Sequence, residues 1–313
     1  KVLSLSEAVE RHVPDGVGLL SVGGMHLHNN PMALVREVVR QGLRISRLLT
    51  SPCGALNADL LVGAGLVEEI ATSYVGFEHL GLAPCFRRAV ESGSIRILEC
   101  DEAYITHGLY AGAGGLPFIP LPAGLETSDV PKVNQESYAM TRDPFTGRQV
   151  LVGAPLRPDV ALIHASMADE RGNAVLGGAH FVDKLMVQAA KTVLLQVERV
   201  VSTEEISRHP VGTTIPGFLV HGVVEVAGGC YPTASHGAYN VDEEQIKLYL
   251  SMAGSDEGVR DYLTQNVTGA TEAEYLEKAS PRLDDLRYDI PTSIAQLKAH
   301  AAARTEAPTG KRR

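Results

Sequence analysis

The sequence predicts an α/β fold, with an open, mostly parallel sheet and helices on both of its faces. Short apolar runs alternate with segments of helical spacing along most of the 313 residues, and this rhythm is typical of parallel sheets. Glycine or proline stands near many of the predicted element ends. The chain is 44% hydrophobic and 21% charged, as in soluble globular proteins, so disordered and fibrous classes are not indicated.

The first third of the chain contains strands joined by helices. Proline suits the first turn of a helix, so Pro31 indicates a start, and Gly42 indicates the end of the same helix. Apolar residues recur at helical spacing between them. The predicted strands are 17–22, 45–50, 67–73 and 95–99, and the predicted helices are 6–12, 31–41, 57–64, 84–92 and 102–114.

The rest of the chain repeats this rhythm after a long interruption. Residues 122–149 are rich in proline, glycine and polar side chains, and we expect an irregular excursion that is functional or covers a site. The strands predicted beyond it are 150–154, 160–164, 192–197 and 220–226, and the helices are 183–191, 203–208, 243–252, 255–266 and 272–278. Without an internal repeat or linker, we expect a single domain at 1–290, then a peripheral helix and mobile basic tail at 291–313.

Charge and cysteine content exclude several classes of protein. The net charge of −9 argues against a nucleic-acid surface, which needs clustered lysine and arginine. No apolar stretch is long enough to span a membrane, so we expect no membrane association and a cytoplasmic location. The four cysteines lie far apart without a C-x-x-C pair, which argues against a zinc knuckle or disulfide framework.

A glycine pair, Gly23-Gly24, lies between a predicted strand and the helix that Pro31 begins. Glycine permits positive φ and leaves no Cβ to block a ligand, so the loop can present backbone N–H groups to an anion or acyl oxygen. Its spacing fits neither common nucleotide-binding fingerprint. On the glycines alone, a plain strand-to-helix turn is the preferred interpretation.

Spacing also argues against a metal site and a serine hydrolase. His26 and His28 alternate, but no carboxylate or thiol follows at a companion spacing, and the other histidines are scattered. We therefore expect no metal. The glycine-flanked serine of a nucleophile elbow is absent from the sequence.

Two glutamates are candidates for catalysis. Glu78 and Glu102 each follow a predicted parallel strand, and ligands bind at the carboxyl edge of open α/β sheets. Either carboxylate can serve as nucleophile, general base or helper to a partner's carboxylate. Glu102 also opens a predicted helix, where an acid stabilises the helix dipole whatever the function. Both interpretations stay open.

An ordered set of short segments resembles the α subunit of family I coenzyme A transferases, and most closely the glutaconate CoA-transferase group. The set extends from residue 3 to about residue 250. It begins with the glycine loop and Asn30-Pro31. The other segments are Ala58-Asp59-Leu60-Leu61-Val62-Gly63-Ala64-Gly65, Phe86-Arg87-Arg88-Ala89, Gly115-Leu116-Pro117-Phe118-Ile119-Pro120, Asp159-Val160-Ala161-Leu162-Ile163-His164-Ala165, Val197-Glu198-Arg199-Val200-Val201 and Ile215-Pro216-Gly217.

The resemblance implies a NagB/RpiA-like α/β subunit that pairs with a homologous β subunit, commonly as α2β2. The reaction it implies moves CoA between an acyl-CoA and a small carboxylic acid by a ping-pong route, through an acyl-glutamyl anhydride and a glutamyl-CoA thioester. CoA is then a substrate, and no permanently bound cofactor is expected. The nucleophilic glutamate is expected on the β subunit, since this chain lacks the Ser-Glu-Asn-Gly signature.

The resemblance also assigns site residues. Gly23 and Gly24 match a glycine loop that lines the cleft and can donate N–H groups to a thioester oxyanion, and Asn30-Pro31 continues it. The chain departs from its relatives at Met25-His26-Leu27-His28, which leaves the acyl group and the role of both histidines open. The predicted substrate- or CoA-binding residues are Gly23, Gly24, Met25, His26, Asn30 and Pro31, and the predicted supporting catalytic residues are Glu102 and Glu78.

Two alternatives to a transferase subunit remain. Glu102 belongs to an Asp-Glu pair like one in a branch of the family that hydrolyses carbon–carbon bonds of ring-derived CoA thioesters. A ring-opening hydrolase subunit that uses Glu102 is the first alternative. Because the chain has no self-contained nucleophile–base pair, a non-catalytic CoA-binding subunit is the second.

Overall fold

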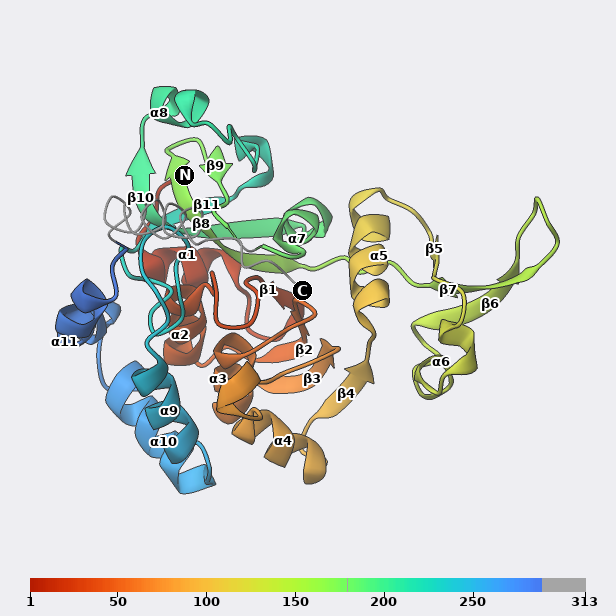
Figure 1. Ribbon diagram of the computed structural model, residues 1–313, viewed down its shortest axis with the longest axis horizontal. Helices are drawn as coiled ribbons and strands as arrows, with labels where there is room; N and C mark the ends of the chain where they lie inside the picture. Colours follow the sequence, from red (N-terminus) through yellow and green to blue (C-terminus); the bar gives the residue numbers. More distant parts are fainter. Residues whose placement is uncertain (179, 289–313) are drawn as a thin grey trace, which may run out of the picture.

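The main sheet is open and built from parallel strands. In the computed structural model, which describes residues 1–178 and 180–288, the strand order is β11-β10-β8-β1-β2-β3-β4 (Figure 1). Each neighbouring pair in this order is parallel, whereas β9 adds to β8 in the antiparallel direction. The strands are β1 Val17–Val22, β2 Ile45–Thr50, β3 Val67–Thr72, β4 Arg96–Glu99, β8 Val160–Asp169, β9 Ala174–Val175, β10 Thr192–Val201 and β11 Gly222–Glu225. The predicted fold class is confirmed.

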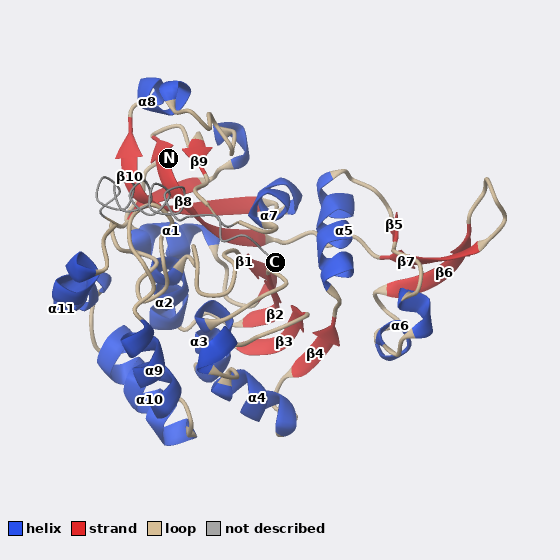
Figure 2. Ribbon diagram, viewed as in Figure 1, coloured by secondary structure: helices blue, strands red, loops and turns tan. Residues whose placement is uncertain are grey.

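Helices cover both faces of this sheet, because its strands are apolar on both sides (Figure 2). On β2, Leu48 packs into the core beneath one helical layer, and the next residue, Leu49, packs into the core beneath the other. On β8, Leu162 packs into the same core as Leu48, and Ile163 packs into the same core as Leu49. The first layer holds α1 Leu5–His12, α2 Met32–Gln41, α3 Leu56–Gly63 and α4 Pro84–Glu91, and the second holds α5 Glu102–Ala113 and α7 Asp183–Ala189.

Three further helices lie near the C-terminal end of the described chain. Ile246 and Tyr249 of α9, with Val259 and Tyr262 of α10, join the core of the first layer. Their bounds are α9 Glu243–Met252, α10 Asp256–Leu263 and α11 Glu272–Asp285, and a π-helical turn, Thr264–Thr268, follows α10. The tail predicted at 291–313 lies outside the described residues, and the single domain stays a prediction. No helix in ranges 1–178 and 180–288 has the length and apolar character to cross a bilayer.

Residues 122–149, expected to be irregular, contain part of a second sheet, and that expectation was wrong. β5, β7 and β6 form a three-stranded antiparallel sheet that extends away from the main body (Figure 1). The strands are short, and β6 buries only its first residue, Tyr138, so it lacks the apolar alternation that identifies a strand. The elements are β5 Ile119–Pro120, α6 Val130–Val133, β6 Tyr138–Arg142 and β7 Gln149–Gly153.

Two strands are longer than predicted. β8 continues to Asp169 and β10 to Val201, because the two strands remain paired up to these residues. The short helix α8, Thr203–Arg208, follows β10, and the side chain of Ser202 caps it by accepting the N–H of Glu205. The helix after Thr271 also exceeds its predicted length.

Candidate active site

The candidate site lies at the carboxyl edge of the main sheet, where ligands bind in open α/β folds. β1, β2, β3 and β4 are parallel neighbours, so the segments that follow them reach the same edge. These segments carry His26 after β1, Cys53 after β2, Glu78 after β3 and Glu102 after β4. Four neighbouring strand ends therefore deliver one imidazole, one thiol and two carboxylates to this edge.

His26 and Glu78 face each other from strained backbone. Nδ1 of His26 lies 3.4 Å from Oε1 of Glu78. Their φ angles are +49° and +55°, in the left-handed region that costs a non-glycine residue about 1–3 kcal/mol. Asn29, at +54°, is the only other non-glycine residue with positive φ among residues 1–178 and 180–288. Strain of this kind persists only where neighbouring contacts impose it, and it concentrates at functional sites.

The backbone of His26 is held from both sides. Its N–H donates to the carbonyl of Cys53 at 2.9 Å, and its carbonyl accepts from Nδ2 of Asn30 at 2.8 Å. The ring packs edge-on against Tyr74, with the centroids 6.0 Å apart. Nδ1 is buried and lies within ion-pair distance of Glu78, yet it makes no hydrogen bond. The side chain is thus positioned before any ligand binds.

Cys53, which no sequence motif singled out, follows β2 at the same edge of the sheet as both predicted catalytic carboxylates. Burial raises the pKa of its thiol, and the charges of Glu102 and Glu78 raise it further. Glu102 is exposed at the start of α5, after the helix-capping residue Asp101. A signal for Cys53 was present in the sequence, because it follows a predicted strand just as the two glutamates do.

The N–H groups of the glycine pair are already occupied. Gly23 donates to the carbonyl of Leu162 at 2.9 Å, and Gly24 donates to Oδ1 of Asp183 at 2.8 Å. The predicted donation to a thioester oxyanion does not fit this arrangement, because neither group is free. What the site requires of the glycines is space: a Cβ on Gly24, whose φ is +94°, would lie 2.3 Å from Oδ1 of Asn30.

Two buried polar residues that no sequence motif indicated anchor this loop. Nδ2 of Asn57, at the start of α3, donates to the carbonyl of Gly23 at 3.0 Å. Asp183, at the start of α7, is 2% exposed, and burial raises the pKa of its carboxyl group. Its Oδ1 holds Gly24, while Oδ2 is buried without a hydrogen-bond partner. Both contacts join residues far apart in the sequence, so no local pattern could indicate them.

The remaining predicted residues support the loop. Met25 and His28 exchange two backbone hydrogen bonds of 2.9 Å, which closes a tight turn around His26. Asn30 and Pro31 are fully buried at the entry to α2. Burial lowers the pKa of half-buried His28, which favours the neutral imidazole at this position.

One group of metal-type ligands occurs among the described residues, and none of its members is a predicted site residue. The ligand atoms of His164, Glu198 and Cys230 all lie within 4.8 Å of one another. Burial lowers the pKa of His164 to about 3, and its Nε2 lies 3.0 Å from the hydroxyl of Ser235. Glu198 accepts from the hydroxyl of Tyr239 at 2.9 Å. These hydrogen bonds account for the geometry of the group, and the absence of a metal site stays a prediction.

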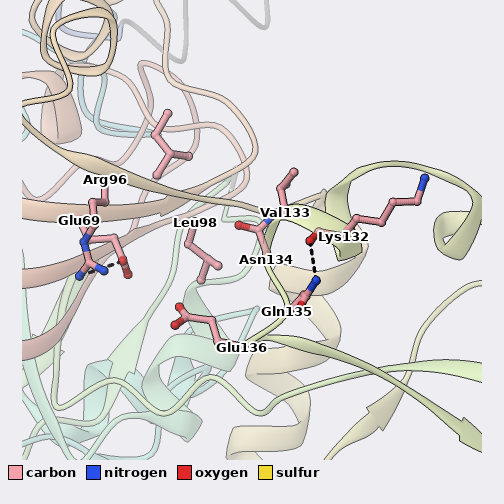
Figure 3. Close-up of a pocket in the computed structure, with 9 residues that line it drawn as sticks. Glu69, Arg96, Leu98, Lys132, Val133, Asn134, Gln135 and Glu136 are labelled. Atoms are coloured by element: carbon pink, nitrogen blue, oxygen red, sulfur yellow. Dashed lines mark hydrogen bonds and ion pairs between the residues drawn. The ribbon is translucent and has the colours of Figure 1, made fainter.

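Two hollows are lined by residues other than those predicted for the site. One of about 640 Å³ separates β4 from the segment around α6, and its Arg96 pairs with Glu69 at 3.2 Å (Figure 3). None of the predicted site residues lines it. The other, of about 590 Å³, is lined partly by Gly177 and His236. Asn29 bonds to both of these residues, so this hollow adjoins the far end of the glycine loop.

Residues 2–226 match the family described as coenzyme A transferase. One subunit of the 3-oxoadipate CoA-transferase of Pseudomonas knackmussii is 34% identical over 275 residues, which are 87% of this chain and 95% of that protein. The IpdA subunit of a cholesterol ring-cleaving hydrolase from Mycobacterium tuberculosis is 32% identical over 268 residues, 82% of this chain and 89% of the relative. An uncharacterized Archaeoglobus fulgidus protein is 35% identical over 92% of this chain, which spans only 64% of that relative's length.

Two solved structures have folds similar to that of this chain. Glutaconate coenzyme A-transferase from Acidaminococcus fermentans superimposes with a TM-score of 0.86 at 28% identity, covering 93% of this chain and 96% of that one. A variant of the decarboxylase AibA/AibB gives a TM-score of 0.74 at 35% identity, with coverage of 84% and 98%. Family match, relatives and fold coincide: this chain belongs to the coenzyme A transferase family, as a subunit of the α type.

Proposed function

We propose that this chain is the α subunit of a heteromeric CoA-transferase that moves CoA between an acyl-CoA and a small carboxylic acid. The observation that carries the proposal is the convergence of His26, Glu78 and Glu102 at the carboxyl edge of a sheet with this family's fold. Relatives that are themselves named as single subunits of CoA-transferases support a partner chain. We further propose an α2β2 assembly in the cytoplasm, with CoA thioesters as substrates and no resident cofactor.

In this proposal, the reaction proceeds through a glutamyl-CoA thioester on the β subunit. The β glutamate attacks the thioester carbonyl and expels CoA thiolate, which then attacks the resulting anhydride and releases the acid. The α chain contributes one wall of the cleft. Gly23 and Gly24 let that wall pack closely, because a Cβ on either would clash with Asp183 or Asn30, and two strained segments position His26 and Glu78 toward the reacting groups.

The test compares the purified chain with its complex with the β subunit. CoA transfer from acetyl-CoA to a panel of short-chain acids is measured, and borohydride trapping followed by mass spectrometry locates the modified glutamate. We expect turnover only from the complex, with the trapped glutamate on the β subunit. Robust transfer by the isolated chain, or a trapped residue on it, contradicts the proposal.

A second candidate function is hydrolysis of a CoA thioester derived from a ring, with Glu102 as base. Two observations favour it: Glu102 is exposed at the same sheet edge as Cys53 and Glu78, and a hydrolase subunit is among the relatives. The discriminating variant is Glu102→Gln in the complex, with Glu99→Gln, an exposed glutamate on β4, as control. Hydrolysis predicts that only Glu102→Gln abolishes turnover, whereas near-normal turnover in that variant removes this candidate.

A further inference from the structure

We propose that His26 binds a carboxylate of the acid substrate as an imidazolium, with Glu78 as its counter-ion. The inference rests on the proposed function, because it concerns the acid that accepts or releases CoA. It goes beyond that function by naming the group that recognises the acid and by coupling binding of the acid to uptake of a proton.

The position of His26 suits it to this role. The loop holds the residue in a left-handed conformation through its N–H bond to Cys53 and its carbonyl bond from Asn30. Nδ1 is buried beside Glu78 at 3.4 Å but makes no hydrogen bond. In sites without ligand, functional hydrogen bonds are often long and tighten only when the substrate binds. Only an imidazolium donates from both ring nitrogens, so that Nδ1 can bond to Glu78 while Nε2 bonds to the carboxylate of the acid.

The charges at this edge of the sheet favour a cation beside an incoming acid. Glu78 and Glu102 follow the parallel neighbours β3 and β4, so two carboxylates stand at the same edge of the sheet. A substrate carboxylate would meet repulsion there unless a positive charge arrives with it. Histidine is the side chain that gains a charge most readily near neutral pH. Protonation of His26 therefore supplies the compensating charge where the acid binds.

The neighbouring groups indicate that His26, rather than His28, is the imidazole suited to this role. Tyr74 packs against the ring edge-on, and Cys53 contacts the backbone of His26. The other nearby imidazole, His28, is half-buried, and burial lowers its pKa; the charge of Glu78 opposes this shift, whereas His236 and His26 add to it. His26 differs because a carboxylate lies directly beside its ring nitrogen.

The test is calorimetric titration of glutarate into the α–β complex in two buffers of different ionisation enthalpy. At about pH 7.5 we expect glutarate to bind with uptake of about one proton in the wild type. In His26→Gln, binding weakens about tenfold and proton uptake disappears. The matched control is His79→Gln, an exposed imidazole on the residue next to Glu78 that pairs with Glu243 at 3.2 Å, and it retains both properties.

Two further measurements keep the test decisive if His26→Gln folds poorly. His26→Asn is the second variant, because asparagine tolerates positive φ, and it should lose proton uptake while the complex stays assembled. In steady-state assays, the KM for the acid rises and the KM for acyl-CoA does not. Unchanged glutarate affinity and proton uptake in both variants overturn the inference. Failure of the wild-type complex to transfer CoA instead overturns the proposed function.

Discussion

The imidazole of His26 and the carboxylate of Glu78 meet at 3.4 Å, although each stands on backbone in the left-handed region. No sequence motif next to either residue predicts its positive φ angle. Glu78 opens a short 3-10 turn, Glu78–Leu80, whose end is Gly81, and His26 lies inside the turn closed by Met25 and His28. Two costly conformations that place an imidazole beside a carboxylate at the carboxyl edge of the sheet indicate selection for function rather than for stability.

Substitution of Glu78 should therefore separate stability from activity. In Glu78→Asn, relief of the strain should raise the free energy of unfolding by up to about 1 kcal/mol, because asparagine accepts positive φ more readily. Glu78→Gln keeps the strain and should leave stability nearly unchanged. Both variants lose the carboxylate, so turnover of the complex should fall about a hundredfold or more. Urea denaturation and steady-state assays measure the two effects, and full activity in either variant contradicts the assignment.

Gly24→Ala should disrupt the loop far more than the same change at another left-handed glycine. The added Cβ at Gly24 would lie 2.3 Å from Oδ1 of Asn30, whereas nothing lies within 4 Å of a Cβ added at Gly16, where φ is +73°. Gly16→Ala should cost about 1–2 kcal/mol, the strain alone. Gly24→Ala should cost more and also abolish activity, as thermal unfolding and turnover assays can show. Equal losses of stability in the two variants would mean that the loop rearranges freely.

Asp183→Asn tests the buried carboxyl group that holds Gly24. Burial raises the pKa of Asp183, so the folded state retains the proton above the ordinary value of 3.8. The stability that this group contributes is complete below pH 3.8 and is lost as pH rises through the folded pKa. Asparagine keeps the acceptor oxygen but buries an amide NH2 without a partner, at a cost of about 1–3 kcal/mol.

The difference in stability between wild type and Asp183→Asn should therefore be largest near pH 4 and shrink toward pH 7. Urea denaturation of both proteins across this range measures it. A difference that grows with pH has the opposite sign and would show that the folded protein stabilises the ionised carboxylate. Asp183→Ala, which removes the acceptor, should release Gly24 and lower stability at every pH.

Much of the fold followed from local sequence patterns. The strand at 17–22 and the helix that ends at Gly42 agree with β1 and with α2 to within one residue, because apolar spacing and terminal residues mark both. β6 was not predicted, because it buries only one residue and therefore lacks an apolar pattern. It belongs to a small sheet outside the main body. The continuation of β8 to Asp169 depends on pairing with β10, which no single segment reveals.

The same reasoning predicted only part of the candidate site. Positions after strands could be located from the predicted topology, which is why Glu78 and Glu102 were selected. The hydrogen bonds that occupy the glycine N–H groups could not be predicted, because their acceptors are Leu162 and Asp183, which are distant in sequence. The pairing of His26 with Glu78 depends in turn on two unusual φ values. The candidate site thus depends on long-range contacts and on strained backbone conformations, and the periodicity of apolar residues in the sequence indicates neither.

The ion pair between Arg36 and Glu272 joins α2 to α11, and removal of one partner should strongly destabilise the fold. Arg36 is 2% exposed; it donates to Glu272 at 2.9 Å and to the carbonyl of Tyr231 at 2.8 Å, and its guanidinium lies 4.2 Å from the centre of the Tyr275 ring. Arg40 also donates to Glu272, at 2.8 Å. Glu272→Gln leaves a buried guanidinium without its counter-charge, so the free energy of unfolding should fall by about 3–5 kcal/mol at pH 7.

The pH dependence of this loss identifies its cause. Burial raises the pKa of Glu272, but Arg36 and Arg40 outweigh burial and hold it below the ordinary 4.5. The stability from the ionised carboxylate is therefore present above pH 4.5 and disappears as pH falls through the folded pKa. Wild type and Glu272→Gln should converge as pH falls from 4.5 through the folded pKa, whereas Glu91→Gln, which breaks the exposed pair with Arg87, should resemble wild type throughout. Denaturant unfolding at several pH values measures these differences, and a gap that persists unchanged in acid would place the loss in packing rather than in charge.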